Sequence, residues 1–221
     1  MTYFLEQIII YNHFMISGIL ISLLIFIYFQ INNLKILSIV LKFLLILNFS
    51  TFYIYLLSTG NFSFKIHLPL HLCYLTELGI LIALLFKLPT LYPWLVLNSL
   101  GGGITGFTNS NLTDEALLIE RIHLYLSHFN LLLFSLFIFK QKLIISKPIF
   151  LKSIIFNSSL FILVVIFNKA MGSNYWFTNH KPPGTNLTLL LPDWPYYVLI
   201  LISIGLISYY ITFKLLLINK R

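Results

Sequence analysis

The chain has 221 residues, of which 59% are hydrophobic and only 9% are charged. Soluble domains carry about 25% charged residues, so this composition excludes an ordinary soluble protein and predicts a polytopic membrane protein. A net charge of +8 would favour nucleic acid as a partner in a soluble protein. Here most lysines lie between apolar runs, where they orient spans against anionic lipid, so we expect no nucleic-acid partner.

Apolar runs separated by polar or basic breaks predict an all-α fold, a polytopic membrane helix bundle of about seven transmembrane helices. We expect a single domain over residues 1–221, with spans at approximately 12–31, 34–57, 66–86, 92–107, 122–139, 149–168 and 196–218. The fourth run is the shortest and contains four glycines, and a re-entrant segment there would invert everything after it. The longest connection, Lys169 to Pro195, is predicted to be an ordered, functional loop over the outer face.

Basic residues are distributed unequally between the two sides of the predicted bundle. Four of them fall on the side of the N-terminus: Lys65, Arg121, Lys169 and Lys181. Nine fall on the opposite side: Lys35, Lys87, Lys140, Lys142, Lys147, Lys152, Lys214, Lys220 and Arg221. This asymmetry predicts a cell-membrane protein with the N-terminus and active site towards the outer face and the C-terminus in the cytoplasm. No basic region precedes the first run, so we expect no cleaved signal peptide.

Ionisable side chains interrupt the third and fifth predicted spans, and such groups are costly in a bilayer and usually functional. At about 1.5 Å of rise per residue, Cys73 lies ~12 Å below Lys65 and His128 lies ~10 Å below Arg121. A cysteine and a histidine at matching depth predict a thiolate–imidazolium pair, in which the histidine takes the thiol proton. The alternative is that Cys73 is a small apolar packing residue. Other candidate supporting residues in these spans are His71, Glu77, His123 and Ser127.

Helical geometry separates the remaining histidines from the thiol. Residues turn by about 100° each, so Cys73 and Glu77 share one face while His67 and His71 share the opposite face. A zinc site using Cys73 with both histidines is therefore poor, although His67, His71 and His128 could still bind zinc. We expect no metal and no cofactor. His67 and His123 lie close to the predicted interface and are expected to be surface or packing residues.

Two further features of the sequence leave alternatives open. Glu77 could orient His128 as the third member of a Cys, His and acid set, or it could be a protonated or Lys42-paired carboxyl. Gly102 and Gly106 have small-xxx-small spacing, which indicates close helix packing rather than phosphate binding, because the lysine and Ser/Thr of a phosphate-binding loop are missing.

Four motifs in order resemble the YwaF-like family of multipass membrane proteins: HLPLHLC ending at Cys73, SH at Ser127 and His128, GSNYWF followed by KP from Gly172, and WPYY from Trp194. That family is related to a eukaryotic transmembrane ether-phospholipid acyltransferase, and the resemblance implies an acyl-transfer centre in which Cys73 and His128 are catalytic. It also implies a substrate loop with Gly172, Asn174, Tyr175 and Trp194. The sequence departs from the family at Ser173, where Thr is usual, and at Asp193.

The residues and the resemblance lead to one main hypothesis. An intramembrane transacylase would move a fatty acyl chain from a membrane phospholipid, through a Cys73 thioester, to a lysophospholipid or lyso-lipoprotein acceptor. An oxyanion donor is also needed, and His71 or a backbone amide freed by Pro69 is a candidate. Two alternatives stay open: an intramembrane lipid hydrolase that depends on the thiol or on zinc, and a non-enzymatic transporter or lipid-binding protein.

Overall fold

The computed structural model describes residues 2–113, 115–184 and 186–218, with the side chains of residues 2–12 left out. This part of the chain is all-helical, as predicted, and contains no strand. Its seven α-helices are α1 (Thr2–Gln30), α2 (Leu34–Ser58), α3 (Leu72–Leu85), α4 (Tyr92–Thr108), α5 (Leu118–Lys140), α6 (Lys147–Met171) and α7 (Tyr196–Ile218). Short 3-10 helices at Pro89–Leu91, Tyr175–Phe177 and Leu187–Leu190 lie in the connections.

Five of the described helices are long and apolar enough to cross a membrane, namely α1, α2, α5, α6 and α7. The other two are shorter: α3 has 14 residues and α4 has 17. The predicted third span, 66–86, is wrong at its start, because residues 60–71 form turns and α3 begins only at Leu72. Pro69 offers no backbone N–H and disfavours the helical conformation of Leu68, so the helix cannot extend through this segment.

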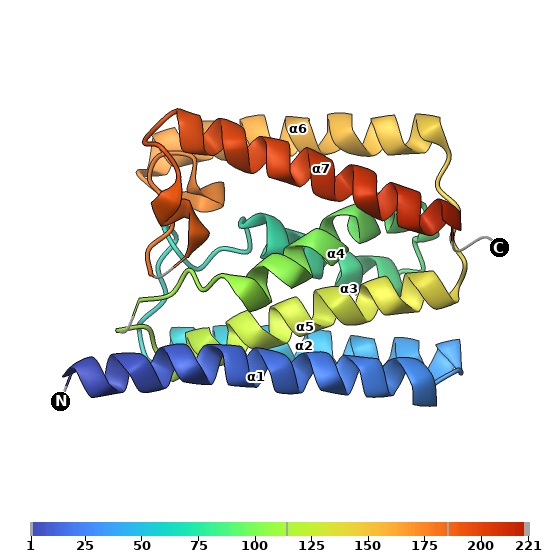
Figure 1. Cartoon of the computed structure of the whole chain (residues 1–221), viewed down its shortest axis with the longest axis horizontal. Coiled ribbons are helices and arrows are strands. Elements are labelled where there is room, and N and C mark those ends of the chain that lie inside the picture. The colour runs from blue at the N-terminus through green and yellow to red at the C-terminus, as the bar shows by residue number, and fades with distance from the viewer. Residues whose placement is uncertain (1, 114, 185, 219–221) are drawn as a thin grey trace.

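The helices form a bundle in which α4 and α5 occupy the centre (Figure 1). These two helices make the most extensive contact in the bundle, α2 and α1 pack on the α5 side, and α6 and α7 pack against α4. In α5, 67% of the residues of the apolar stretch are buried, whereas only 11% are buried in α6 and in α7. Polar side chains can therefore be buried between α3, α4 and α5, whereas α6 and α7 present mainly apolar side chains outward.

The connections gather at two ends of the bundle. The α2–α3, α4–α5 and α6–α7 connections lie at one end, which we call the loop end, and α4 returns to it after α3 (Figure 1). There the Asn109 side chain, just after α4, accepts a hydrogen bond from the backbone of Leu187 at 3.0 Å. The fourth helix therefore leads back to the loop end, and its full crossing of the bilayer stays a prediction. At the opposite end, Lys140 donates to Asn32 at 3.0 Å.

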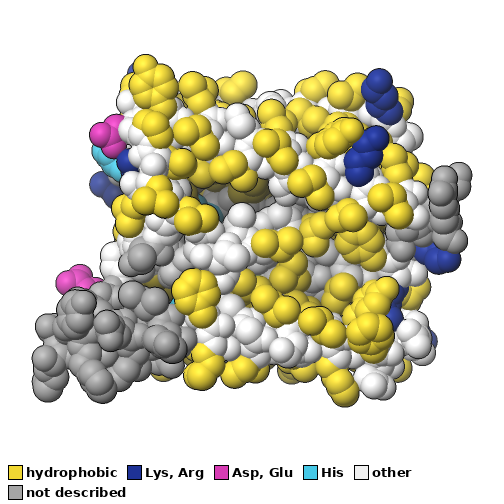
Figure 2. Space-filling view, viewed as in Figure 1, with side chains coloured by type: hydrophobic (Ala, Val, Ile, Leu, Met, Phe, Trp, Pro, Cys, Tyr) yellow, Lys and Arg dark blue, Asp and Glu magenta, His cyan; other side chains and the backbone are white. Residues whose placement is uncertain are grey.

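Charge follows the same division. On the face drawn in Figure 2, hydrophobic side chains cover the flank, most basic side chains gather at the end opposite the loops, and the visible acidic side chains lie at the loop end. Lys220 and Arg221, which contribute to the predicted asymmetry, lie outside the described residues. The structure thus separates the two predicted sides, and which of them faces the cytoplasm stays a prediction.

Candidate functional site

The loop between α6 and α7 is built around one buried amide, that of Asn168 in the last turn of α6. Its Oδ1 accepts from the Tyr175 backbone at 2.9 Å and from the Ser173 hydroxyl at 2.8 Å. Its Nδ2 donates to the Tyr175 carbonyl at 2.7 Å and to the Thr178 hydroxyl at 2.8 Å. Gly172 ends α6 with φ +61°, a left-handed conformation that glycine adopts without strain. Together these contacts turn the chain back over the bundle.

Tyr175 fastens this loop to the non-helical segment before α3. Its hydroxyl donates to the Phe64 carbonyl at 2.8 Å and accepts from the Leu68 backbone at 3.0 Å. Burial raises the pKa of Tyr175 to about 12, so the hydroxyl keeps the proton that it donates. Its acceptor role satisfies a backbone N–H that the helix break at Pro69 leaves without an intrahelical partner. Two motifs more than a hundred residues apart are thus one structural unit.

The other loop residues complete the turn. Asn174 Oδ1 accepts from the backbones of Asn179 and His180 at 3.0 and 3.1 Å. Trp176 donates through Nε1 to the Leu70 carbonyl at 2.6 Å, and its backbone lies 3.3 Å from His71 Nδ1. Trp194 is largely exposed and donates to the Thr178 carbonyl at 3.1 Å, so it packs the loop from outside.

Cys73 and His128 meet at the same point of α4, the backbone of Gly102. Cys73 lies in the first turn of α3, is partly exposed, and has its Sγ 3.3 Å from where a Cβ on Gly102 would lie. His128 of α5 has its Nδ1 2.9 Å from the Gly102 carbonyl oxygen. The predicted depth of Cys73 assumed a helix that begins at Lys65, whereas α3 begins at Leu72. Both side chains nevertheless lie at the same level along α4, that of Gly102. No hydrogen bond between these two described side chains is present.

The contact with Gly102 determines which nitrogen of the neutral His128 ring carries the proton. A carbonyl oxygen only accepts, so Nδ1 donates and Nε2 keeps its lone pair. The ring also lies directly on the backbone of α4, because a Cβ at Gly106 would overlap its ring atoms. Close packing at Gly102 and Gly106, predicted from their spacing, is confirmed. The ring is thus held in one position, with Nδ1 as donor and Nε2 as the basic nitrogen.

Glu77 lies one turn below Cys73 and is the centre of a buried polar network. Its Oε1 accepts from Asn48 at 2.9 Å and from Asn130 at 2.7 Å, and its Oε2 accepts from the Ser127 hydroxyl at 2.6 Å. Three donors on one carboxyl fasten α3 to α2 and α5. Glu77 therefore does not orient His128 through a hydrogen bond, and its described partners are amides and a hydroxyl rather than Lys42.

His123 belongs to the same network, at its end towards the loops. Its Nδ1 lies 3.1 Å from Asn48 Oδ1, and its ring stacks on Phe52 at 3.9 Å between centroids. The side chain is 2% exposed. Of the two expectations for His123, surface or packing, the packing role is confirmed. Because Asn48 donates to Glu77 and accepts from His123, it links the two groups, a role that the sequence reasoning missed.

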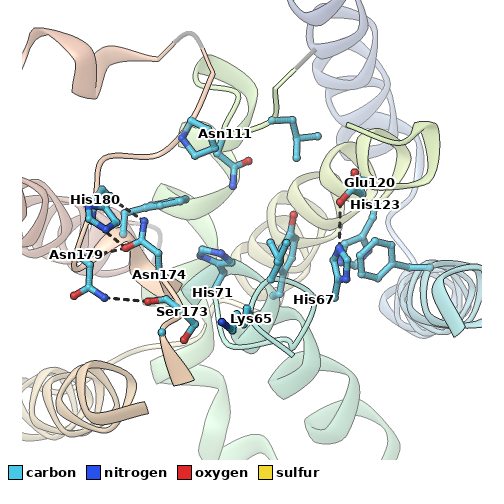
Figure 3. A pocket seen from close by; sticks show the side chains of 17 residues that line it. Lys65, His67, His71, Asn111, Glu120, His123, Ser173, Asn174, Asn179 and His180 are labelled. Carbon is cyan, nitrogen blue, oxygen red and sulfur yellow. Dashed lines mark hydrogen bonds and ion pairs between the residues drawn. The ribbon is translucent and has the colours of Figure 1, made fainter. Parts of the chain in front are cut away.

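A cavity of about 480 Å³ opens at the loop end, above this network (Figure 3). His67, His71 and Tyr74 line it from the start of the third helical region, Glu120 and His123 from α5, and the α6–α7 loop closes the other side. Cys73 and His128 are not among its lining residues. The two catalytic candidates and the histidine-lined cavity are therefore separate, adjoining regions.

His67 and His71 lie in this cavity rather than on a helical face. His67 Nδ1 accepts from the Ser63 backbone at 2.9 Å, so Nε2 carries the proton and donates to Glu120 at 3.2 Å. His128 lies elsewhere, against α4. Within the described ranges, no three His, Cys, Asp or Glu side chains form a group that could hold a metal ion, and the zinc set His67, His71 and His128 is not assembled.

Comparison with known proteins gives one match. The model of the TMEM164 family matches residues 3–213. No curated protein and no solved structure matches the chain. The multipass membrane class predicted from the motifs is supported at this level, and the relation to the YwaF-like family and to an ether-phospholipid acyltransferase stays a prediction. Because the match covers nearly the whole chain, this protein belongs to the TMEM164 family of transmembrane proteins.

Proposed function

We propose that the protein is an intramembrane transacylase in which Cys73 is the nucleophile and His128 the general base. The observation that carries the proposal is the convergence of both side chains on Gly102, where the hydrogen bond through Nδ1 makes Nε2 the basic nitrogen of a neutral His128. A histidine beside a thiol is the arrangement that activates cysteine for attack on an ester. The resemblance of four motifs to an acyl-transfer family supports the same pair.

Each half-reaction conserves atoms and charge. In the first, the Cys73 thiol passes its proton to His128 Nε2, the sulfur attacks a phospholipid ester carbonyl, and the tetrahedral intermediate expels the lysolipid oxygen. His128 returns the proton to that oxygen, so a C–O bond has broken and a C–S bond has formed. In the second, His128 takes the proton of an acceptor hydroxyl or amine, which attacks the thioester, and Cys73 recovers its proton. No cofactor is consumed.

The position of the pair suits a lipid substrate. Cys73 is partly exposed, and Figure 2 shows a hollow between α7 and the layer beneath it, towards the loop end. Among the residues described, α3 makes no extensive contact with α6 or α7. Acyl chains from the bilayer can therefore approach the first turn of α3 from the side. The donor is a membrane phospholipid, and the acceptor is a lysophospholipid or the amino terminus of a lyso-lipoprotein.

Mass spectrometry of the protein purified from its native membrane tests the thioester. We expect a fatty acyl adduct on Cys73 that neutral hydroxylamine removes, and no adduct on the Cys73→Ser variant. Supplying a lysophospholipid should discharge the adduct and yield diacyl phospholipid. Release of free fatty acid at the same rate with and without the acceptor would instead identify the hydrolase alternative, and the absence of any adduct under turnover would contradict both.

We also propose that the loop end faces outward, because the described lysines concentrate at the other end. Cys73 is the single cysteine, so Cys73→Ser provides a cysteine-free background. In it, a membrane-impermeant thiol reagent added to intact cells should label Asn179→Cys, which is exposed in the α6–α7 loop, and should not label Gln141→Cys, which is exposed after α5. The reverse pattern would place the loop end in the cytoplasm.

A further inference from the structure

The cavity at the loop end has the size and the chemistry of a ligand site that the Cys73 and His128 pair does not account for. Its volume of about 480 Å³ lies within the ~300–1,000 Å³ range of small-molecule sites. We propose that it binds the phosphate of the lipid substrate's headgroup, with Lys65 as the main contact. This inference rests on the proposed function, since it assigns the headgroup subsite of the same reaction.

Charge is the first argument. Among the described lining residues Glu120 is the only carboxylate, and both its oxygens are engaged: Oε1 with His67 at 3.2 Å and Oε2 with the Leu117 backbone at 2.7 Å. Lys65 also lines the cavity, and no ion pair involving its ammonium is present in the described part of the chain. The formal charges of Lys65 and Glu120 balance, but the Lys65 ammonium is not paired with that carboxylate and can therefore attract an anion on its own side of the cavity.

The placement of Lys65 is the second argument. Its Nζ lies 3.7 Å from the position that a Cβ on Gly172 would take, so the ammonium lies beside the turn that begins the α6–α7 loop. In Figure 3, Lys65 and His71 lie close together on one side of the cavity, with Asn174 and His180 across from them. The remaining titratable lining groups are His67, Tyr74, Glu120 and His123. His71 Nδ1 accepts from the Trp176 backbone, so its Nε2 carries the proton, and a phosphate between these walls would meet the Lys65 ammonium and this N–H.

An orphaned acceptor supplies the third argument. Asn111 lines the cavity, and its buried Oδ1 has no hydrogen-bond partner among the described residues. A buried acceptor without a partner costs free energy, so such an atom at a cavity wall indicates a place where a donor completes the site. The ionised phosphate has no proton to donate, so the partner of Oδ1 would be a hydroxyl or ammonium of the headgroup, or water. An apolar occupant, such as an acyl chain, would leave it unsatisfied. The cavity therefore takes the polar end of the lipid.

Connection to the thiol is the fourth argument. His71 and Tyr74 are three residues apart at the start of α3 and both line the cavity, whereas Cys73 between them faces Gly102 of α4. A glycerophospholipid carries its phosphate only a few bonds from its ester carbonyls. With the phosphate in the cavity, the ester can therefore reach the first turn of α3, where the sulfur lies.

Two acyl donors with the same chain separate headgroup recognition from chemistry: a phospholipid, and a 4-nitrophenyl ester that has no phosphate. We expect Lys65→Ala to raise KM for the phospholipid by about tenfold or more, as for a lost charge-assisted contact, with little change in kcat. The same variant should acylate Cys73 from the nitrophenyl ester at the normal rate, and Lys65→Arg should keep normal phospholipid kinetics. Lys169→Ala, an exposed lysine at the same end outside the cavity lining, is the matched control.

Binding to the inactive Cys73→Ser protein tests the subsite without the reaction. Titration with dihexanoylphosphatidylglycerol, below its micelle concentration, should show saturable binding that Lys65→Ala weakens and Lys169→Ala does not. If this binding is seen but no Cys73 adduct forms in the wild-type protein, the headgroup site stands and the transacylase proposal fails. Inorganic phosphate binding as tightly as the phospholipid would identify a free-phosphate site and overturn the headgroup assignment. Equal behaviour of Lys65→Ala and Lys169→Ala in both assays would also overturn it.

Discussion

The two polar regions of this bundle differ in nearly every physical respect. The thiol region, formed by Cys73, Gly102 and His128, has its side chains packed against the backbone of a central helix. The cavity at the loop end has a volume of about 480 Å³ and is lined by a lysine and several imidazoles, and no thiol is among its described lining residues. One region thus suits bond making, and the other suits recognition. On the proposed function, the difference teaches that a membrane protein of only 221 residues would separate these two tasks by one turn of a helix.

The two regions are also held in place differently. Central helices fix the thiol region, because glycines let α5 approach α4 closely and Glu77 fastens α3 from below. Loops fix the cavity, and their positions depend on the buried side chains of Asn168 and Tyr175. Variants of each region should therefore fail in different ways, and the expected effects decrease in the order below.

The largest effect is expected at the thiol. Cys73→Ser should abolish acyl transfer with little change in Tm, because a hydroxyl fits the space of the thiol but is far less nucleophilic. His128→Ala should be similarly inactive, and the double variant should be no worse than either single one, since the two residues act as one unit. Radiolabelled phospholipid with a lysophospholipid acceptor measures the transfer.

A contrary result would move the chemistry to the other region. If Cys73→Ser keeps near-normal transfer while His123→Ala, on the cavity wall, loses it, then the thiol is a packing residue and the cavity holds the reaction. His123 is stacked and hydrogen-bonded, so Tm must be measured for that variant in parallel.

The next largest effect is expected at Gly106, against which the His128 ring packs. A Cβ at Gly106 would overlap the His128 ring, so Gly106→Ala must displace the imidazole or separate α4 from α5. We expect a loss of about 1–3 kcal/mol of stability, typical of overpacking, together with most of the transferase activity. Gly205→Ala in α7 is the matched control, since a Cβ there meets nothing within 4 Å. Equal Tm and activity for the two variants would show that His128 does not depend on this close approach.

Much of this arrangement could be predicted from the sequence, and the failures have physical causes. Hydropathy located all seven helices, because apolar length is what a bilayer demands. The predicted third span wrongly included residues 66–71 as helix. Local hydropathy does not reveal that Tyr175, far away in sequence, accepts the hydrogen bond of the Leu68 backbone. Asn48 and Asn168 were overlooked as well. Each is a buried amide in an apolar helix, and the cost of placing an amide there could have identified both residues as structural centres.

A smaller effect is expected at Glu77, whose hydrogen-bond network holds α3 against α2 and α5 between the two regions. Glu77→Gln keeps an acceptor for Asn48 and Asn130, and the Ser127 hydroxyl can rotate to accept from the new amide, so activity should stay within severalfold of normal. Glu77→Leu leaves those donors without a partner and should lower stability by about 1–3 kcal/mol. Thermal unfolding in detergent, with activity assayed below Tm, measures both. Loss of activity in Glu77→Gln at unchanged Tm would show that the carboxylate charge takes part in the reaction.

The smallest effect is expected at the rim of the loop end, where Lys181 and Asp193 form an ion pair at 3.0 Å. The side chain of Asp193 is 97% exposed. Water and salt screen a pair so exposed, and Lys181 keeps its 2.7 Å bond to the Leu191 carbonyl when the carboxylate is neutralised. Asp193→Asn should therefore change Tm by no more than about 2 °C and leave phospholipid KM unchanged.

Asn168→Ala, which removes four buried hydrogen bonds from the same loop, should lower Tm clearly and raise that KM. If Asp193→Asn has the larger effect of the two, a surface ion pair rather than the buried amide holds the wall of the cavity, and the contrast between a loop-built recognition region and a helix-built thiol region needs a different physical basis.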